Sequence, residues 1–437
     1  MQGQKIDIRS IERKVAWRVM PFILISYFIS FLDRSNVGIA SLTMNGDVGL
    51  SAQAYGFGAG LFSLAFVIFE IPSNYILYHV GARRWIARIM FTWGLVVIGS
   101  SLITGPNTFY LSRFLLGVSE AGLVPGVLFY MTGWFTKARF ATYTGIFLFS
   151  AVIAPVIGNP IGALIMQMDG TLGLHGWQWL FVLEGIPAVI LAVALYLWLP
   201  DDPKKVGWLT NEEKDLLTAT LDREKIERES HRSDTMKSIW TNKNVWLLGA
   251  AAAFIYLGFS GMYIFLPQII KTLGVTGTVS IGLLSSVPLF VLAIGGLVWV
   301  RHSDRTRERV WHVVIAGFVG FAGFALAAQA SSPLVSMIGI TIGAMGIGGA
   351  MFTLYAIPPL MLTGGAAAVG FALFNSLANL GNAFGPITVG FLRGWSTDFR
   401  LGLMAISLAL LVTAVLAAAL WRLPMLSRAA VAQHPAE

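Results

Sequence analysis

Two adjacent charged residues interrupt an apolar segment near the start of the chain. Asp33 and Arg34 lie within SYFISFLDRSNVGIASL (residues 26–42), and Arg113 and Glu120 interrupt a second apolar segment. A charge at the centre of a bilayer costs about 2.5 to 3.5 kcal/mol on insertion scales, so such residues face a protein interior or a water-filled cavity. Carboxylates and guanidinium groups in that setting are suited to exchanging protons and to binding anions.

The composition indicates that these charges belong to a membrane protein. Of the 437 residues, 56% are hydrophobic and 12% are charged, which is more apolar surface than one soluble core can bury. Apolar stretches of about 20 residues, long enough to cross a hydrocarbon core about 30 Å thick, recur along the chain. They predict twelve membrane-spanning helices, at residues 17–41, 54–79, 84–104, 108–134, 140–167, 178–199, 244–270, 279–300, 310–329, 333–360, 367–392 and 400–421.

One long hydrophilic segment, residues 201–243, divides the spans into two sets of six. Its middle has the charge pattern of a solvated helix, for which Asn211 is the predicted N-cap. We therefore expect a six-helix bundle at 1–200, a cytoplasmic linker at 201–243 and a second six-helix bundle at 244–437. Two sets of six indicate an internal duplication. The predicted fold class is an all-α membrane protein with two pseudo-symmetric bundles.

The basic residues predict the orientation of the helices. All but five of the 30 lysine and arginine residues lie in the N-terminal segment, four connections and the C-terminal tail, which share one side of the membrane. Since basic residues favour the cytoplasmic side, both ends are expected to be cytoplasmic, in the cell inner membrane. Residues 1–16 are polar and lack an apolar h-region, so no removable signal peptide is expected. The net charge of +8 follows from this topology, and nucleic acid is not an expected partner.

No constellation for catalysis or metal binding is present in the sequence. There is no cysteine, and the six histidines lack the spacing of metal ligands. We therefore expect no enzymatic activity, no cofactor and no metal, in a monomer whose partners are lipid and a small solute.

The heights of the four charges in the membrane bring them together. Asp33 lies about 22 Å above the cytoplasmic edge, and Arg113 about 9 Å below the outer edge, at a rise of about 1.5 Å per residue. In a core about 30 Å thick these depths nearly coincide, so we expect Asp33 to pair with Arg113. Glu120 lies two turns deeper on the face of Arg113. Arg34 is turned about 100° from Asp33 and is free to present its guanidinium fork to an anion.

Polar stripes mark two helices in the second half of the chain. Asn375, Asn379 and Asn382 follow helical spacing, and Tyr256 and Tyr263 lie two turns apart with Ser260 between them. Such a stripe either lines a polar cavity or joins helices within the membrane, and the spacing leaves both readings open.

Short motifs add a resemblance to a known family. HVGARR (residues 79–84) and DRTRER (304–309) are similar to the cytoplasmic loop motif of the major facilitator superfamily, although Tyr78 stands at the Asp position of the first copy. Within that superfamily the chain resembles the anion:cation symporter family, in segments that we quote here: FLDRSNVGIA (31–40), FEIPSNYILYHVGARRWIARIM (69–90), RFLLGVSEAGLVPG (113–126), GWQWLFVLEGIPA (176–188) and NSLANLGNAFGP (375–386).

The resemblance implies twelve helices, alternating access and uptake of an organic carboxylate with protons. We expect Asp33 and Glu120 to take up protons and Arg34 to bind the anion. Arg113 would then re-pair with a carboxylate and expel the proton. The other expected substrate contacts are Arg113, Asn375, Asn379, Tyr256 and Tyr263. Asn379 is favoured among them, because the family places substrate-contacting polar groups on this helix.

Several alternatives stay open. The four charges could form a structural ion-pair network, and the fold also serves antiporters and exporters of organic acids or drugs. A sensor would need a signalling module larger than the linker and the tail. For Glu70 and Glu184 the sequence favours a packing role over a functional one. Phenylalanines in the second span favour a flat or small carboxylate over a polyol, which would leave hydroxyl groups unpaired.

Overall fold

The computed structural model describes residues 7–230, 242–358, 365–396 and 398–420, and this part of the chain contains helices and no strand. The predicted ends of the tenth and twelfth spans, at residues 360 and 421, lie outside the described residues. So do parts of the predicted linker and tail and the basic residues in them.

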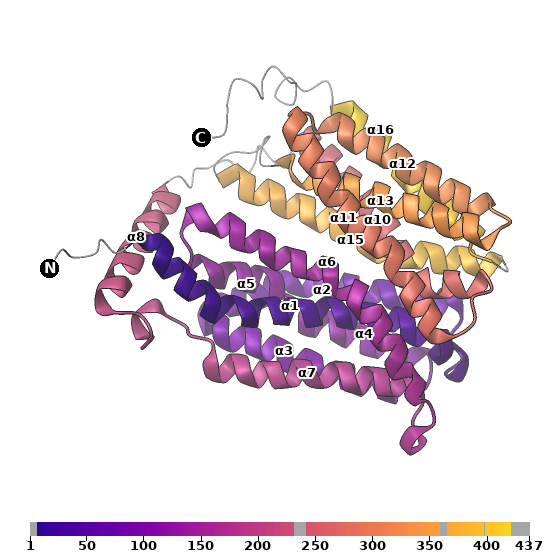
Figure 1. Cartoon of the computed structure of the whole chain (residues 1–437), viewed down its shortest axis with the longest axis horizontal. Helices are drawn as coiled ribbons and strands as arrows, with labels where there is room; N and C mark the ends of the chain where they lie inside the picture. The colour runs from indigo at the N-terminus through magenta and orange to yellow at the C-terminus, as the bar shows by residue number, and fades with distance from the viewer. Residues whose placement is uncertain (1–6, 231–241, 359–364, 397, 421–437) are drawn as a thin grey trace.

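The first half of the chain forms one group of helices (Figure 1). Four short 3₁₀ turns accompany it: η1(Ser100–Leu102), η2(Met166–Met168), η3(Thr171–Gly173) and η4(Pro203–Lys205). Its α-helices are α1(Ile8–Asp47), α2(Ala52–Val80), α3(Ala82–Gly99), α4(Pro106–Glu120), α5(Leu123–Thr132), α6(Lys137–Ile165) and α7(Gly176–Trp198).

A linker helix, α8(Asn211–Ser230), precedes the second group. The helices of that group are α10(Lys243–Thr272), α11(Thr278–Thr306), α12(Val310–Gln329), α13(Pro333–Tyr355), α15(Gly365–Trp395) and α16(Arg400–Leu420). Within the described residues, 11 stretches are long and apolar enough to cross a membrane, with α4 and α5 counted as one. The 31-residue α15 covers the predicted eleventh span. The predicted all-α fold of twelve transmembrane helices is therefore confirmed.

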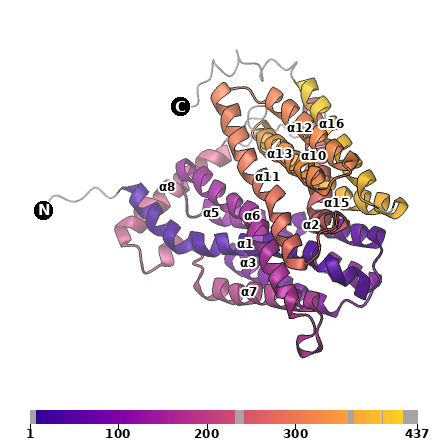
Figure 2. The ribbon, with the colours of Figure 1, turned by 45° about the vertical axis from the view of Figure 1, so that its right-hand side comes forward.

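The two groups are bundles that contact each other through α2 with α15 and α6 with α11. Figure 2 shows the same division from another side. We call the end of the molecule where α8 lies the linker end, and the opposite end the far end. Glycines allow backbone contact toward the far end: a Cβ added to Gly56 would lie 2.4 Å from the carbonyl oxygen of Pro386, and one added to Gly60 would lie 2.5 Å from that of Ala383.

Exposure along α2 separates its two ends. Gly56 and Gly60 are buried in its first turns, whereas Ile71 and Tyr75, toward the linker end, are 79% and 69% exposed. Direct hydrogen bonds between the bundles also lie toward the far end, such as that from Tyr55 Oη to the carbonyl oxygen of Ile264, 3.3 Å. The bundles are thus closed on each other at the far end and separated at the linker end.

The linker helix is attached to the first bundle. Glu213 accepts a hydrogen bond from Lys14, and Glu224 Oε2 accepts one from the amide of Lys137, 2.9 Å. The hydrogen bond from Lys14 lowers the pKa of Glu213 below its usual value. The predicted N-cap was wrong by one residue. Thr210, not Asn211, caps α8, because its Oγ1 accepts from the Glu213 amide at 3.2 Å while Glu213 Oε2 accepts from the Thr210 amide, the reciprocal arrangement of a capping box.

The loop motifs make ion pairs within their own bundles. Arg83 pairs with Asp201 at 2.9 Å, and Arg309 pairs with Asp304 at 3.0 Å. An aspartate after the sixth span thus partners an arginine of the first motif, whose own Asp position holds Tyr78.

Candidate functional site

Glu120 lies at a break in the fourth span. The sequence predicted one continuous helix over 108–134, but α4 ends at Glu120 and α5 begins at Leu123. The break follows from Pro125, which has no N–H with which to bond the carbonyl group of Ala121 four residues earlier. That carbonyl oxygen instead accepts a hydrogen bond from Ser73 Oγ at 2.6 Å.

Gly122 makes the break possible. Its φ of 89° is in the left-handed region, and a Cβ at this position would lie 2.4 Å from Ser73 Oγ. Ser73 is itself held by the Trp85 indole, which donates to Ser73 Oγ at 2.9 Å. Side chains of α2 and α3 thus hold the backbone in the geometry that places Glu120 at a helix end.

Glu120 is paired with Arg34. Its Oε1 accepts from Arg34 Nε at 2.9 Å and lies 2.7 Å from Arg34 Nη2, and it also accepts from Ser30 Oγ at 2.5 Å. The Glu120 side chain is 1% exposed and that of Arg34 is 23% exposed. A carboxylate at a helix C-terminus is disfavoured by the helix dipole. The positive charge of Arg34 therefore offsets both the cost of burying the Glu120 carboxylate and its repulsion by the dipole.

Three phenylalanine rings surround the Arg34 guanidinium. Its Cζ lies 4.9, 5.3 and 5.4 Å from the ring centroids of Phe31, Phe62 and Phe66. Phe62 also lies 5.2 Å from Arg113 Cζ, so one ring contacts both guanidinium groups. Such contacts stabilise a cation whose water has been removed. The immediate surroundings of the site are therefore aromatic and cationic.

The predicted pair of Asp33 and Arg113 is not formed, which corrects the sequence-based expectation. The ion pair of this region is Arg34 with Glu120, and Asp33 Oδ1 instead accepts from Asn36 Nδ2 at 3.4 Å. Asp33 Oδ2 and Arg113 Nε are buried without a hydrogen-bond partner among the described residues. Depth along two helices fixes the height of a side chain but not its direction, and here the directions differ.

Asp33 belongs to a second buried cluster inside the first bundle. Electrostatic interactions link its carboxylate to those of Glu184 and Glu120 and to Arg113. Asn36 lies against Glu184 as well, whose Oε2 is buried without a partner among the described residues. The sequence favours a packing role for Glu184, because spacing along one span does not show that α7 packs on α1.

Polar groups of the second bundle form a chain of hydrogen bonds. Tyr256 Oη donates to Tyr355 Oη at 3.0 Å, and Tyr355 Oη donates to Asn375 Oδ1 at 3.3 Å. Two of the predicted site residues are therefore joined by Tyr355. The sequence does not single out Tyr355, because it is the only tyrosine in an apolar helix and belongs to no polar stripe.

Tyr263 connects the two bundles. Its Oη donates to the carbonyl oxygen of Phe31 at 3.4 Å, and it interacts electrostatically with Arg34 and Glu120. Tyr27 interacts with the same pair and with Tyr256. Tyr27 lies two turns before Arg34 on α1, so helical spacing was a signal that could have found it.

Asn379 lies apart from these hydrogen bonds. It is partly buried on α15 and makes no hydrogen bond with the described residues. The structure thus brings Arg34, Glu120 and Tyr263 together, joins Tyr256 to Asn375, and places Asp33 and Arg113 deeper in the first bundle. Within the described part of the chain, no cluster of His, Asp or Glu is suited to a metal ion.

Comparison with known proteins identifies the family. Residues 23–386 match the family model described as Major Facilitator Superfamily. A "Putative tartrate transporter" of Agrobacterium vitis is 42% identical over 408 residues, which cover 92% of this chain and 90% of that protein. A "Quinolone resistance transporter" of Acinetobacter baumannii is 38% identical over 408 residues, covering 93% and 94%.

A solved structure has the same fold. It is a bacterial homolog of the human lysosomal transporter Spinster in an inward-facing and occupied conformation, with a TM-score of 0.76 at 15% identity, over 92% of this chain and 96% of that one. The match to the family model includes all four membrane-embedded charges. The chain therefore belongs to the major facilitator superfamily and is a secondary transporter, not an enzyme.

Proposed function

We propose that this transporter imports a small organic carboxylate together with protons. The observation that supports it most is the state of Arg34: the guanidinium is partly exposed, yet its Nε and Nη2 are both engaged by one oxygen of the buried Glu120. A guanidinium fork is the preferred protein partner of a carboxylate. Glu120 therefore occupies the position that a substrate carboxylate would take.

Competition for Arg34 couples the proton to the anion. When Glu120 is protonated it loses its negative charge, and its hold on the guanidinium weakens. A substrate carboxylate can then pair with Arg34 while Glu120 keeps its proton. Because each ligand favours the binding of the other, the two are transported in the same direction.

Release reverses this exchange. With the bundles separated at the linker end, the substrate leaves, Glu120 loses its proton, and the Arg34–Glu120 pair re-forms as it stands here. Asp33, which interacts with Glu184 and Arg113, serves as a second proton site. Tyr256, Tyr263, Asn375 and Asn379 form the substrate contacts of the second bundle.

Rocking of the two bundles, residues 1–200 and 244–437, exposes Arg34 to each side in turn. The linker end is cytoplasmic in this proposal, because the basic residues gather there. The chain is accordingly expected in the cell inner membrane with both termini inside.

The rings around Arg34 favour a flat or compact carboxylate. The relative named for tartrate supports an organic acid, whereas the relative named for quinolone resistance supports export of an organic acid or a drug as the second candidate. The direction of flux distinguishes the two.

Uptake into proteoliposomes tests the proposal. We would measure radiolabelled tartrate, a sugar acid, phthalate and nicotinate with and without an inward proton gradient. Gradient-driven accumulation of one acid is the expected result. Counterflow that ignores the gradient would contradict symport, and accumulation driven by an outward gradient would favour the second candidate.

A further inference from the structure

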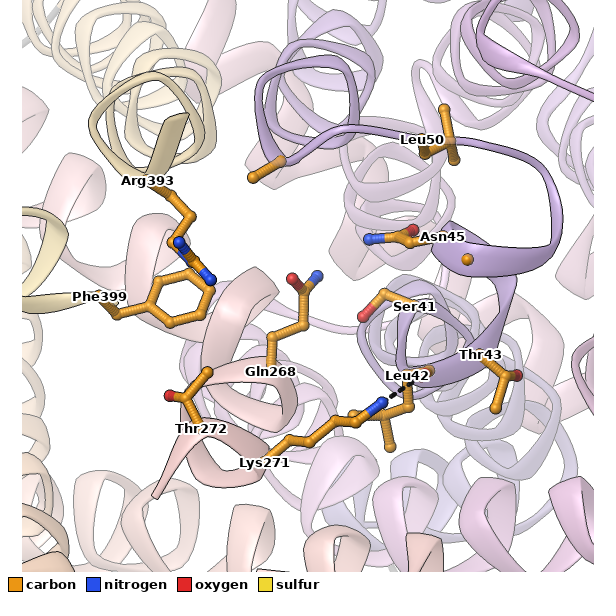
Figure 3. Close-up of a pocket in the computed structure, with 12 residues that line it drawn as sticks. Ser41, Leu42, Thr43, Asn45, Leu50, Gln268, Lys271, Thr272, Arg393 and Phe399 are labelled. Carbon is orange, nitrogen blue, oxygen red and sulfur yellow. Dashed lines mark hydrogen bonds between the residues drawn. The ribbon is translucent and has the colours of Figure 1, made fainter. Parts of the chain in front are cut away.

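A pocket lies at the far end of the molecule, on the boundary between the bundles (Figure 3). Its volume is about 330 Å³, and it is lined by the end of α1, the end of α10, Arg393 of α15 and Phe399. It is separate from Arg34 and Glu120, which do not line it. Pockets that hold small ligands begin at about 300 Å³, so a compact solute would fit.

The charged groups of this pocket are all positive. Lys271 and Arg393 line it, and no aspartate or glutamate does. Lys271 Nζ donates to the carbonyl oxygen of Leu42 at 2.8 Å. Arg393 Nη1 donates to the carbonyl oxygen of Ser396 at 2.5 Å, and its Cζ lies 5.1 Å from the Phe399 ring centroid. Neither cation pairs with a carboxylate in the described part of the chain, so both retain donors for an anion.

Two amide groups of the lining are unsatisfied. Gln268 Nε2 and Asn45 Oδ1 are buried and have no partner at hydrogen-bond distance among the described residues, although the Gln268 side chain also interacts with the Tyr55 hydroxyl group. Figure 3 shows the Gln268 amide between Arg393 and Asn45, with the Asn45 side chain directed toward it. Buried polar atoms without partners are uncommon in folded proteins. An amide donor beside two cations suits a carboxylate, and an amide oxygen suits a hydroxyl group on the same ligand.

We propose that this pocket is a second binding site for a small carboxylate, which it captures at the far face before the bundles separate there. The proposal rests on the organic-acid transport proposed above. The pocket lies on the boundary that must open, and Lys271 joins the two bundles across it. A carboxylate that engages Lys271 competes with the Leu42 carbonyl group and so weakens one hydrogen bond that holds the far end closed.

Equilibrium binding of tartrate to the full chain in nanodiscs of neutral lipid tests this site separately from Arg34. In an Arg34→Gln background we expect one remaining binding site for tartrate. Adding Lys271→Gln and Arg393→Gln should weaken the affinity of that site at least tenfold. Arg400→Gln, which removes an exposed charge outside the pocket, should leave it unchanged. Lys271→Arg, which keeps the charge, should retain binding and controls for loss of structure.

Three results would overturn the inference: no remaining site in Arg34→Gln, a remaining site that the double variant does not weaken, or equal displacement of tartrate by inorganic phosphate. In uptake assays with Arg34 intact, Lys271→Gln with Arg393→Gln should raise KM at least fivefold and leave the maximal rate within twofold. Proton-driven uptake that persists with an unchanged KM would refute this pocket while leaving the proposed function intact. Absence of any gradient response in the wild type would refute the proposed function alone.

Discussion

At the scale of single residues, the pairing of Glu120 with Arg34 depends on the direction in which each side chain points, and not only on its depth in the membrane. The four membrane-embedded charges were predicted from sequence, and their depths were placed close together. Their pairing was not predictable, because Pro125 and Gly122 end α4 at Glu120 and because Phe62 of α2 lies against the Arg113 guanidinium. Both facts involve packing between helices, which hydropathy along one helix does not contain.

Replacing Glu120 by glutamine should separate binding from coupling. Glutamine has no charge to hold Arg34, so the substrate carboxylate should bind equally well at all pH values. In the wild type, affinity should fall as pH rises, by up to about tenfold per pH unit for one linked proton.

Binding of nicotinate, a monocarboxylate, between pH 5.5 and 8.5, beside counterflow and gradient-driven uptake, measures this. Glu120→Gln should keep counterflow and lose gradient-driven accumulation. The exposed Glu212→Gln of α8 serves as the control. A wild-type pH profile that survives in Glu120→Gln would rule out the coupling role.

At the scale of elements, the broken fourth span is the feature that sequence reasoning did not find. Hydropathy predicts where a span crosses the membrane, and the apolar residues on both sides of the break are equally suited to lipid. The signal was Gly122 followed by Pro125, which also fits a continuous, kinked helix. Only the contact with Ser73 of α2 distinguishes the two.

Gly122→Ala should destabilise this break. A non-glycine residue in the left-handed region costs about 1 to 3 kcal/mol, and the added Cβ would overlap Ser73 Oγ. We expect a lower apparent Tm and reduced uptake. Gly145→Ala, in α6 where a Cβ meets nothing within 4 Å, should have little effect. Equal Tm and uptake in the two variants would contradict the role of the break.

Docking of α8 should depend on pH through Glu213. Its pKa is lowered in the folded chain, so the stabilisation is present above the usual glutamate value of about 4.3 and is lost as pH falls through the lower folded value. Hydrogen exchange of α8 amides should therefore be constant from pH 7 to 5, after correction for intrinsic rates, and rise below about pH 4. Glu213→Gln should show the faster exchange at every pH; protection equal to the wild type would count against this contact.

At the scale of the whole molecule, twelve spans and two bundles followed from composition, length and one hydrophilic interruption. The sequence did not predict which end of the two bundles is closed, because closure depends on contacts between residues far apart in sequence. The Cβ positions of Gly56 and Gly60 against α15 are examples.

Gly56→Ala should prevent closure at the far end and favour the state open there. The chain has no cysteine, so Ser41→Cys, at a buried far-end position, provides a single labelling site. A membrane-impermeant maleimide added outside should label it several-fold faster in Gly56→Ala than in the parent. Gly46→Ala, with open space around its Cβ, is the control. Equal labelling rates in all three would refute this account of closure.

The Arg34–Glu120 pair also determines how the carrier responds to voltage. In the empty state the pair has no net charge, and with one proton and one monocarboxylate bound it again has none. Neither the empty nor the loaded carrier then moves net charge across the membrane when it reorients. Moving one elementary charge across a potential of 100 mV is worth about 2.3 kcal/mol. A dicarboxylate with a single proton would leave one negative charge uncompensated and be repelled by an inside-negative membrane. The pair therefore favours electroneutral transport, and a doubly charged acid would need a second proton, for which Asp33 is the available carboxylate.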